Sequence, residues 1–369
     1  MQKQLTNSEK NRYSRHISLD AVGLLGQEKL KAAKVLVIGA GGLGCPVLQY
    51  LTAAGVGTIG IIDFDTIEES NLQRQILFTT NDIGKSKAKV AALRLAQLNP
   101  YVNFNVFNEK LTTKNAVNLF SAYDIIVDGT DNFSTRYLVN DACLLTSKPL
   151  VYGAIYKFEG QVTVFNYNNG PSYRCLFPEP PNESPPNCSD IGVIGVLPGI
   201  IGTQQANEVI KMILEIGEPL SGKLLTYNAL NNTSFTLKVK RSDSQIEKVL
   251  AKDFNFEAMD YDFFCGIKKE KTMQEISIEE LKEWYQKGLN FKVLDVRDEW
   301  EQPRLEKDNV LQFPLDELDD YVEEIKKYDK VVIICQHGIR SVDALQMLQR
   351  DYQLTNLINL SGGIVSWNN

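Results

Sequence analysis

Residues 34–65 decide the fold, and they read KVLVIGAGGLGCPVLQYLTAAGVGTIGIIDFD. An apolar run at 35–38 is typical of a strand that is buried on both faces of a sheet. Residues 39–44 then match G-x-G-x-x-G, and apolar side chains recur at helical spacing over 45–54. A second apolar run at 59–62 leads into acidic residues. This order predicts a strand, a glycine turn, a helix and a second strand.

The glycine turn indicates a nucleotide site. Gly39, Gly41, Gly42 and Gly44 allow a tight turn and the close approach of a phosphate, and the helix behind them directs N–H groups at an anion. Asp63 lies about 20 residues after Gly44, where a carboxylate can accept hydrogen bonds from ribose hydroxyls. The motif does not identify the nucleotide.

Two other interpretations of this stretch are open. The glycines could form a packing turn that binds no ligand. Residues 35–62 carry no charge and could cross a membrane. Repeated glycines, Pro46 and strand-like ends disfavour the membrane span.

Composition excludes several classes of protein. A chain of 369 residues favours two domains, and 43% hydrophobic with 23% charged residues is ordinary for a globular protein. A net charge of −7 gives no general attraction to nucleic acid or to anionic membranes. The start lacks the apolar core of a signal peptide, and the 6 cysteines include no C-x-x-C pair, so we expect a cytoplasmic protein. With 2 histidines, a Ser–His–Asp hydrolase or a His-rich metal centre is disfavoured.

The whole sequence predicts two α/β domains, 1–240 and 276–369, joined by a charged linker at 241–275. Residues 168–190 hold nearly half of the 13 prolines, so we expect a long loop without regular helix or strand. In the first domain the remaining patterns predict a helix ending at Leu98, a helix at 203–216, and strands at 102–107, 124–127, 150–154, 160–165 and within 223–240. In the second domain they predict helices at 278–288 and 342–350, and strands at 291–297, 331–334 and 357–360.

Cations and acids near the glycine turn favour phosphate chemistry. The cations here are Arg15, Arg74 and Lys87. Hydride transfer by a reductase does not require several cations. A nucleotidyltransferase does require them, because an anionic nucleophile attacks an anionic phosphate. Asp131 follows an apolar strand and is a reasonable Mg²⁺ ligand, because hard cations take oxygen ligands. Each of these residues taken singly could equally be a surface charge or a helix cap.

Five motifs stand in order along the chain: GAGGLG at 39–44, DFD at 63–65, SNLQRQ at 70–75, IGKSK at 83–87 and DGTDN at 128–132. Together they resemble the bacterial sulfur-carrier adenylyltransferases of the MoeB/ThiF family, which are relatives of ubiquitin-activating enzymes. The resemblance runs from Arg12 to about residue 240 and implies a Rossmann-like, ATP-binding adenylating domain. The implied ATP-binding residues are Gly39, Gly41, Gly42, Gly44, Asp63, Ser70, Asn71, Leu72, Gln73, Arg74, Lys87, Asp131 and Asn132.

The resemblance also implies roles. Asp63 would contact the ribose, Arg74 and Lys87 the phosphates, and Asp131 a catalytic Mg²⁺. Arg15 would reach the site of a neighbouring subunit, which implies a homodimer. The substrate would be the C-terminal Gly-Gly carboxylate of a small ubiquitin-like sulfur carrier. Adenylation turns that carboxylate into an electrophile that a sulfur nucleophile can attack.

Two cysteines are candidates for the sulfur chemistry. Cys335, between an apolar strand and a helix, is the expected catalytic residue, because loop N–H groups and Arg340 favour a thiolate or persulfide. Cys335-x-x-Gly338-x-Arg340, with Asp295-Val296-Arg297 before it, resembles the rhodanese sulfurtransferases over about 276–369. The sulfur donor would be a cysteine desulfurase or thiosulfate. Cys188 matches a loop cysteine that bonds the carrier in some members of the adenylyltransferase family; it could equally be an ordinary loop cysteine.

The chain departs from the family at two places. Many members hold a structural zinc with two C-x-x-C pairs, but the corresponding positions here are Ser172 with Cys175 and Asp262 with Cys265, so we expect no zinc. The rhodanese part lacks the usual His-Ile-Pro-Gly segment, and 302–310 is charged instead.

The first hypothesis is therefore an ATP-dependent, Mg²⁺-dependent adenylyltransferase of a sulfur carrier, followed by sulfur transfer to a thiocarboxylate. A carrier of the molybdopterin synthase small subunit type is favoured, with the thiazole (thiamine) pathway carrier as the alternative. Two further hypotheses are a nicotinamide-dependent oxidoreductase and a non-catalytic scaffold. No nucleic acid and no membrane is expected as a partner.

Overall fold

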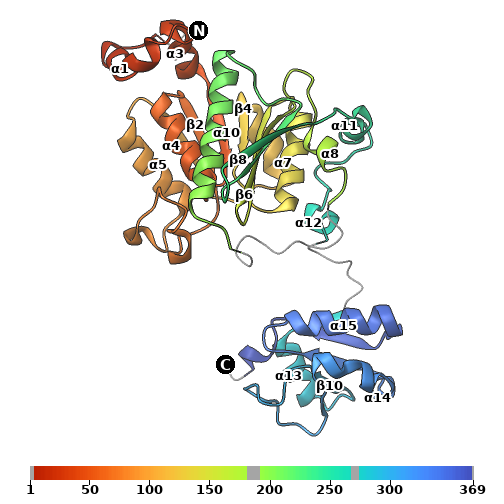
Figure 1. The fold of residues 1–369 in the computed structure, drawn as a ribbon. Helices are drawn as coiled ribbons and strands as arrows, with labels where there is room; N and C mark the ends of the chain where they lie inside the picture. Colours follow the sequence, from red (N-terminus) through yellow and green to blue (C-terminus); the bar gives the residue numbers. More distant parts are fainter. Residues whose placement is uncertain (1–3, 181–191, 267–273, 368–369) are drawn as a thin grey trace. The chain divides into compact units, whose positions relative to one another are not determined.

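The computed structural model describes residues 4–180, 192–266 and 274–367. The chain forms two compact units, residues 1–268 and 269–369, each with its own sheet (Figure 1). Each unit is described by itself below.

The first unit is built on an eight-stranded sheet of order β3-β2-β1-β4-β5-β6-β7-β8. Strands β3 to β5 of this order are parallel, and the pairs from β5 to β8 are antiparallel. Parallel strands buried on both faces explain the continuous apolar runs in the sequence. The strands are β1 Lys34–Ile38, β2 Thr58–Ile62, β3 Asn103–Phe107, β4 Ile125–Asp128, β5 Leu150–Tyr156, β6 Glu159–Phe165, β7 Lys223–Asn228 and β8 Thr233–Lys238.

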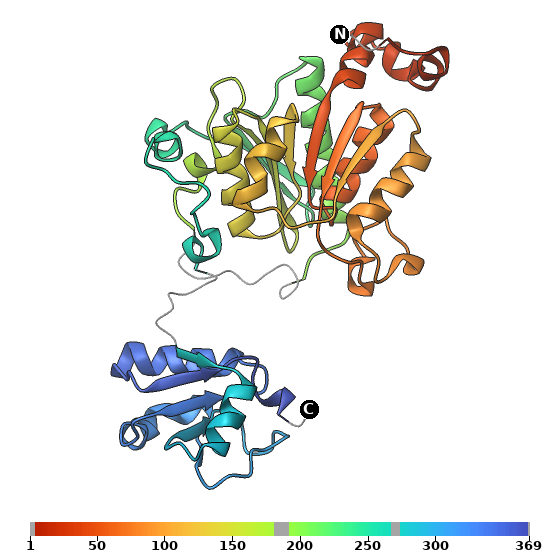
Figure 2. The ribbon, with the colours of Figure 1, turned by 180° about the vertical axis from the view of Figure 1, so that it is seen from behind.

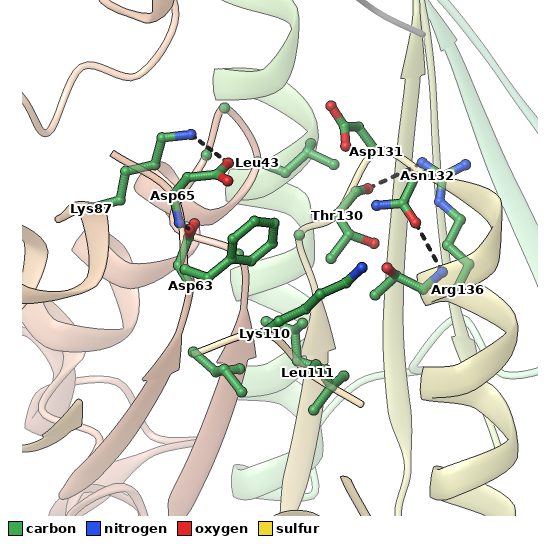
Figure 3. Close-up of a pocket in the computed structure, with 18 of the residues that line it drawn as sticks. Leu43, Asp63, Asp65, Lys87, Lys110, Leu111, Thr130, Asp131, Asn132 and Arg136 are labelled. Atoms are coloured by element: carbon green, nitrogen blue, oxygen red, sulfur yellow. Dashed lines mark hydrogen bonds and ion pairs between the residues drawn. The ribbon is translucent and has the colours of Figure 1, made fainter. Parts of the chain in front are cut away.

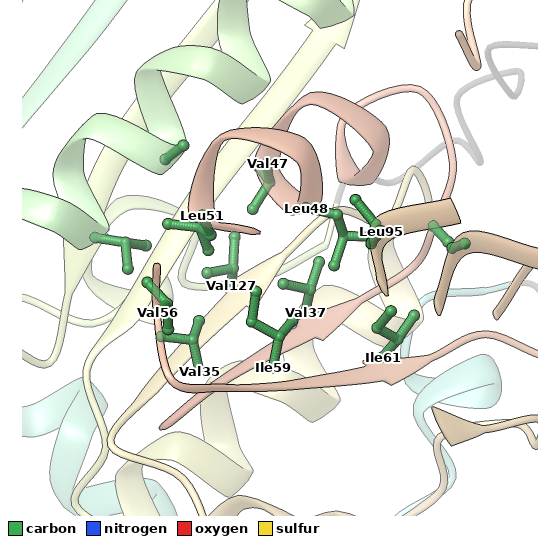
Figure 4. Close-up of a cluster of buried hydrophobic side chains, with 14 of the residues drawn as sticks. Val35, Val37, Val47, Leu48, Leu51, Val56, Ile59, Ile61, Leu95 and Val127 are labelled. Carbon is green, nitrogen blue, oxygen red and sulfur yellow. The ribbon is translucent and has the colours of Figure 1, made fainter. Parts of the chain in front are cut away.

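Helices cover both faces of this sheet. Val35 and Val37 face the core under α4, α5 and α10, which Figure 4 shows, whereas Leu36 and Ile38 face the core under α6 and α7. Alternate residues of this strand therefore pack into the two cores on opposite faces of the sheet, because successive side chains of a strand point to opposite faces. These helices are α4 Gly44–Ala54, α5 Lys87–Leu98, α6 Thr113–Ser121, α7 Phe133–Leu145 and α10 Val196–Leu214.

The N-terminal segment is helical and lies away from the carboxyl ends of the parallel strands (Figure 2). Its helices are α1 Asn7–Arg12, α2 Ser14–Ile17 and α3 Gly23–Ala32. The charge-free stretch at 35–62 forms β1, α4 and β2, so it is not a membrane span. Among the described residues, none of the helices is long and apolar enough to cross a membrane.

Several elements differ from the sequence-based expectation. The long helix begins at Val196 rather than at Thr203, because Pro198 is tolerated in a first helical turn. Helices α6 and α7 were not predicted, and the proline-rich segment includes a short helix, α8 Tyr173–Leu176. The segment 241–275, expected to be a linker, contains α11 Asp243–Leu250 and α12 Tyr261–Phe264, and both contact α7. Residues 267–273 of that segment lie outside the described residues.

The second unit is a parallel sheet of order β11-β10-β12-β13-β9. The two predicted helices and three predicted strands of this unit are present, whereas its other elements were not predicted. Its elements are β9 Gln274–Ile276, α13 Ile278–Gln286, β10 Lys292–Asp295, β11 Val310–Gln312, η3 Leu315–Tyr321, α14 Val322–Ile325, β12 Val331–Ile334, α15 Ile339–Tyr352, β13 Leu357–Leu360 and η4 Ile364–Ser366.

Candidate active sites

A cavity of about 460 Å³ opens at the carboxyl ends of β1, β2 and β4 (Figure 3). Open α/β sheets bind ligands at this edge, where the strand order changes direction. The predicted ATP-binding residues that line it are Gly39, Gly41, Gly42, Asp63, Arg74, Lys87, Asp131 and Asn132. Residues from all five motifs therefore meet in one cavity.

The glycine turn is required by the packing of its own backbone. Gly39 has φ +86°, a conformation that favours glycine. A Cβ on Gly44 would lie 1.9 Å from the carbonyl oxygen of Gly39, so this position accepts no side chain. Helix α4 begins at Gly44, and its N-cap, Leu43, lines the cavity. Leu43 has no side-chain acceptor for the free backbone N–H groups of the first helical turn. A phosphate can accept hydrogen bonds from those N–H groups.

Asp63 is anchored at the end of β2. Its carboxylate accepts hydrogen bonds from the N–H of Ala40 at 2.7 Å and from the N–H of Asp65 at 2.8 Å. Burial raises the pKa of Asp63, and these two N–H donors and Lys87 oppose the rise. The contact with Ala40 joins the acid directly to the glycine turn.

Two cations flank the turn. Lys87 is 7% exposed, and its Nζ lies 3.0 Å from Asp65. Arg74 donates from Nη1 to the carbonyl oxygen of Ser70 at 3.0 Å, and its Cδ lies 3.7 Å from the point where a Cβ on Gly42 would be. Both cations are thus held by nearby partners at the wall of the cavity.

The opposite wall is the loop between β4 and α7. Asp131 is exposed and, in Figure 3, lies across the cavity from Asp65 and Lys87. Asn132 caps α7 by accepting from the N–H of Thr135 at 2.9 Å. The exposed carboxylate of Asp131 fits Mg²⁺, which is usually held by one or two carboxylates together with substrate phosphates and water.

The predicted residues outside the cavity wall have other positions. Gly44 lies beneath the turn, and Ser70 and Asn71 belong to the short helix η1 (Glu69–Asn71), followed by Leu72 and Gln73. Arg15 is exposed on α2, in the N-terminal segment. Cys188 lies outside the described residues.

Some cavity residues were missed by sequence reasoning. Asp65, Lys110, Thr130 and Arg136 all line the cavity. Lys110 follows the carboxyl end of β3, so the rule that selected Asp131 would have selected it as well. Arg136 is 7% exposed between the rings of Phe133 and Tyr152, and no local pattern marks it.

The second unit holds the cysteine loop. Cys335 directly follows β12 and is 1% exposed. Its Sγ accepts from the N–H of Gly338 at 3.1 Å and lies 3.4 Å from Oγ of Ser341. Gly338 has φ +88° and is the N-cap of α15, so the backbone of the loop turns back toward the sulfur.

Arg340 is paired with an acid. Its two terminal nitrogens lie 2.7 Å and 2.6 Å from the two carboxylate oxygens of Glu301. This hydrogen bonding lowers the pKa of Glu301 and raises the pKa of Arg340. Arg297 is fully buried and binds Asp295 in the same bidentate way, which supports a bracing role.

The glycine-turn cavity defines a nucleotide-binding α/β enzyme, and the cysteine loop adds a sulfur-transfer site. Residues 13–248 match the ThiF family, and residues 277–369 match the rhodanese-like domain. The chain belongs to the ThiF family and carries a C-terminal rhodanese domain.

Similar proteins agree with this assignment. The chain is 41% identical over 376 residues to the "probable adenylyltransferase/sulfurtransferase MoeZ" of Mycobacterium tuberculosis, which covers 98% of this chain and 94% of the relative. It is 41% identical over 375 residues to a "probable molybdopterin-synthase adenylyltransferase" of Porphyra purpurea, covering 98% and 93%. The solved structure of E. coli MccB with ATP is 25% identical with a TM-score of 0.56, covering 64% of this chain and 73% of that one. These comparisons confirm the predicted family, fold class and enzyme class, which is an adenylyltransferase and sulfurtransferase.

Proposed function

We propose that this chain uses MgATP to adenylate the C-terminal glycine of a ubiquitin-like sulfur carrier of the molybdopterin synthase small subunit type, and that Cys335 then delivers sulfur. The observation that carries the proposal is the meeting of Arg74, Lys87 and Asp131 around one glycine turn. Hydride transfer by a reductase does not require two cations and a metal-binding carboxylate at the phosphates. The relative from Porphyra purpurea supports the molybdopterin carrier.

Adenylation proceeds by displacement at the α-phosphorus. A carboxylate oxygen of the carrier forms a bond to phosphorus, and the bond to the leaving pyrophosphate breaks. Arg74 and Lys87 offset the negative charge that develops, and Asp63 orients the ribose. Asp131 would hold Mg²⁺, which would supply positive charge to offset the negative charge of the triphosphate.

Sulfur transfer uses the acyl-adenylate as electrophile. The terminal sulfur of a Cys335 persulfide attacks the acyl carbon, and AMP leaves. The product is an acyl disulfide on Cys335. A low-molecular-weight thiol attacks the Cys335 sulfur, which releases the thiocarboxylate and forms a mixed disulfide, and a second such thiol reduces that disulfide. Cys188 is, as the family resemblance implies, a candidate for a bond to the carrier. The donor of the persulfide is a cysteine desulfurase or thiosulfate.

We also propose a homodimer in the cytoplasm. Arg15 is exposed and does not line its own cavity, which suits a residue that serves a neighbouring subunit. The described cysteines, Cys45, Cys143, Cys175, Cys265 and Cys335, are all free thiols, which suits a reducing compartment.

ATP–pyrophosphate exchange with purified carriers tests the proposal. We expect exchange that depends on the molybdopterin-type carrier and is abolished by Asp131→Ala, with weaker exchange for the thiazole-pathway carrier. Mass spectrometry of the carrier should then show the thiocarboxylate. Exchange with neither carrier, or full exchange by Asp131→Ala, contradicts the assignment; preference for the thiazole carrier assigns the other pathway.

A further inference from the structure

One buried carboxylate joins three separate segments of the first unit. Asp141, on α7, is fully buried. It accepts hydrogen bonds from Nε and Nη2 of Arg174 at 2.8 Å and 2.6 Å, and from the hydroxyl of Tyr261 at 2.7 Å. Arg174 lies on α8 and Tyr261 begins α12. Hydrogen bonds to this side chain thus tie α12 and α8 to α7.

Aromatic rings enclose this junction. The guanidinium of Arg174 lies 4.9 Å from the ring centre of Tyr137 and 5.0 Å from that of Phe264, and those two rings contact each other edge to face. Exclusion of water strengthens charge-assisted hydrogen bonds. Removal of one partner would leave a buried charge unpaired, which is costly. The three side chains therefore work as a unit.

The family resemblance implies that positions 172, 175, 262 and 265 correspond to the ligands of a structural zinc, and the junction lies beside them in the sequence. Arg174 stands between positions 172 and 175, and Tyr261 directly precedes Asp262. In this chain Sγ of Cys175 already accepts from the N–H groups of Ser172 at 3.3 Å and Ser242 at 3.2 Å. Serine is a poor zinc ligand, and a tetrahedral structural site needs thiolates or imidazoles. These residues do not fit a structural zinc.

Helix α12 also borders the nucleotide cavity. Asp262 lines that cavity, and so do Arg136 of α7 and the N-cap of α7, Asn132. In Figure 1, α12 lies at the edge of the unit where the parallel strands end. The junction at Asp141 therefore connects two parts of the cavity wall.

We propose that Asp141, Arg174 and Tyr261 form a joint that positions α12 against the nucleotide cavity, in the place of a structural zinc. They are positioning residues, since they act on the cavity through α12. The effect on ATP use rests on the proposed function, whereas the joint itself does not.

The joint is tested first by Tyr261→Phe, which removes one O–H donor and keeps the ring. We expect amide hydrogen–deuterium exchange over residues 254–266 to rise several-fold. The KM for ATP in pyrophosphate exchange should also rise several-fold, with kcat changed by less than about twofold. The matched control is Tyr285→Phe, whose hydroxyl donates to Asn309 at 2.9 Å in the second unit; it should change neither quantity. Unchanged exchange over 254–266 in Tyr261→Phe would overturn the proposal.

A second variant and a metal measurement complete the test. Arg174→Lys keeps the charge but loses the bidentate fork, so it should raise amide exchange over 254–266 more than Tyr261→Phe does. The purified protein should contain far less than stoichiometric zinc, and EDTA should leave amide exchange over 254–266 unchanged. Stoichiometric zinc, or faster exchange in EDTA, would overturn the proposal. Absence of pyrophosphate exchange in the unmutated protein would instead contradict the proposed function. In that case amide exchange and metal content would still test whether the joint exists.

Discussion

Lys87 and Cys335 are two buried side chains that the proposed function uses. Lys87 keeps an ion pair with half-exposed Asp65 while its stem is buried, which restricts the position of its ammonium group. Cys335 is held in the same manner by an N–H group of its own loop. Groups fixed in advance need no reorganisation during the reaction, which is the main source of electrostatic catalysis.

Replacement of Lys87 tests the phosphate role. Lys87→Met should lower kcat for carrier-dependent pyrophosphate exchange by about 10²- to 10³-fold, because the cation is lost and the apolar stem is kept. Lys89→Met is the matched control, since Lys89 is exposed on the same helix, and it should retain full activity. A decrease smaller than about tenfold would show that Lys87 does not serve the phosphates.

Replacement of Cys335 tests the sulfur role. Cys335→Ser should abolish thiosulfate:cyanide sulfur transfer and thiocarboxylate formation, because an alcohol cannot carry persulfide sulfur. Pyrophosphate exchange by the same variant should match the unmutated protein, which serves as the internal control. Sulfur transfer that survives the substitution would assign the chemistry to another thiol.

Among the elements, the unit β1–turn–α4 depends most strongly on its sequence. Strand β1 is buried on both faces, and α4 starts so close to β1 that only glycine fits at its first position. The sequence predicted this unit because its strand, turn and helix follow one another within about 20 residues and each has its own local pattern. Helix α10 packs on α4 and on β5 and β6, and its early start at Val196 depends on those distant partners.

Two alanine substitutions separate a required glycine from a dispensable one. Gly44→Ala should destabilise the first unit by about 1–3 kcal/mol, because its Cβ would overlap a backbone oxygen. Gly199→Ala, in α10 with no atom near its Cβ, should stabilise it by about 0.5–1 kcal/mol. Urea unfolding followed by circular dichroism measures both. Equal stability of the two variants would contradict the close approach at Gly44.

At the scale of the whole molecule, the two units have separate cores. All 3 tryptophans, Trp284, Trp300 and Trp367, belong to the second unit. Tryptophan fluorescence therefore reports on the second unit, while the nucleotide cavity lies within the first. Units with their own cores can unfold in separate transitions.

This separation predicts a selective effect of ligand. MgATP at about 100 times its Kd should stabilise the first unit by about 2.7 kcal/mol, because it binds the folded state only. The thermal transition seen by tryptophan fluorescence should stay unchanged. Differential scanning calorimetry with parallel fluorescence measures both, and a ligand-induced shift in the fluorescence transition would contradict independent unfolding.

Mixed oligomers test the role of Arg15. Arg15→Ala and Lys87→Met should each be inactive in pyrophosphate exchange. If Arg15 serves the partner's site in a homodimer, unfolding and refolding them together should restore about a quarter of the activity, because half of the dimers then hold one intact site. Equal amounts refolded apart and then assayed together give the control. No recovery in the mixture would place Arg15 outside the partner's site.

Much of the candidate site could be read from motifs. Gly42, Asp63, Arg74, Lys87 and Asp131 were predicted, and they line one cavity. Arg136 was not predicted, because its place in the cavity depends on burial between Phe133 and Tyr152 rather than on a local pattern. The pairing of Arg340 with Glu301 was not predicted either, because the two residues are 39 positions apart and no local pattern connects them.

The sequence by itself determined the glycine turn, the strands that flank it, the cysteine loop and the family, because each is written in residues close together along the chain. The tertiary structure alone decided that 243–264 packs on the first unit, and that Asp141 binds Arg174 and Tyr261. Those partners lie 33 and 120 positions from Asp141. Contacts over such separations depend on how the helices pack. Periodicity in the sequence indicates which face of a helix is buried, but it does not indicate which element packs against that face.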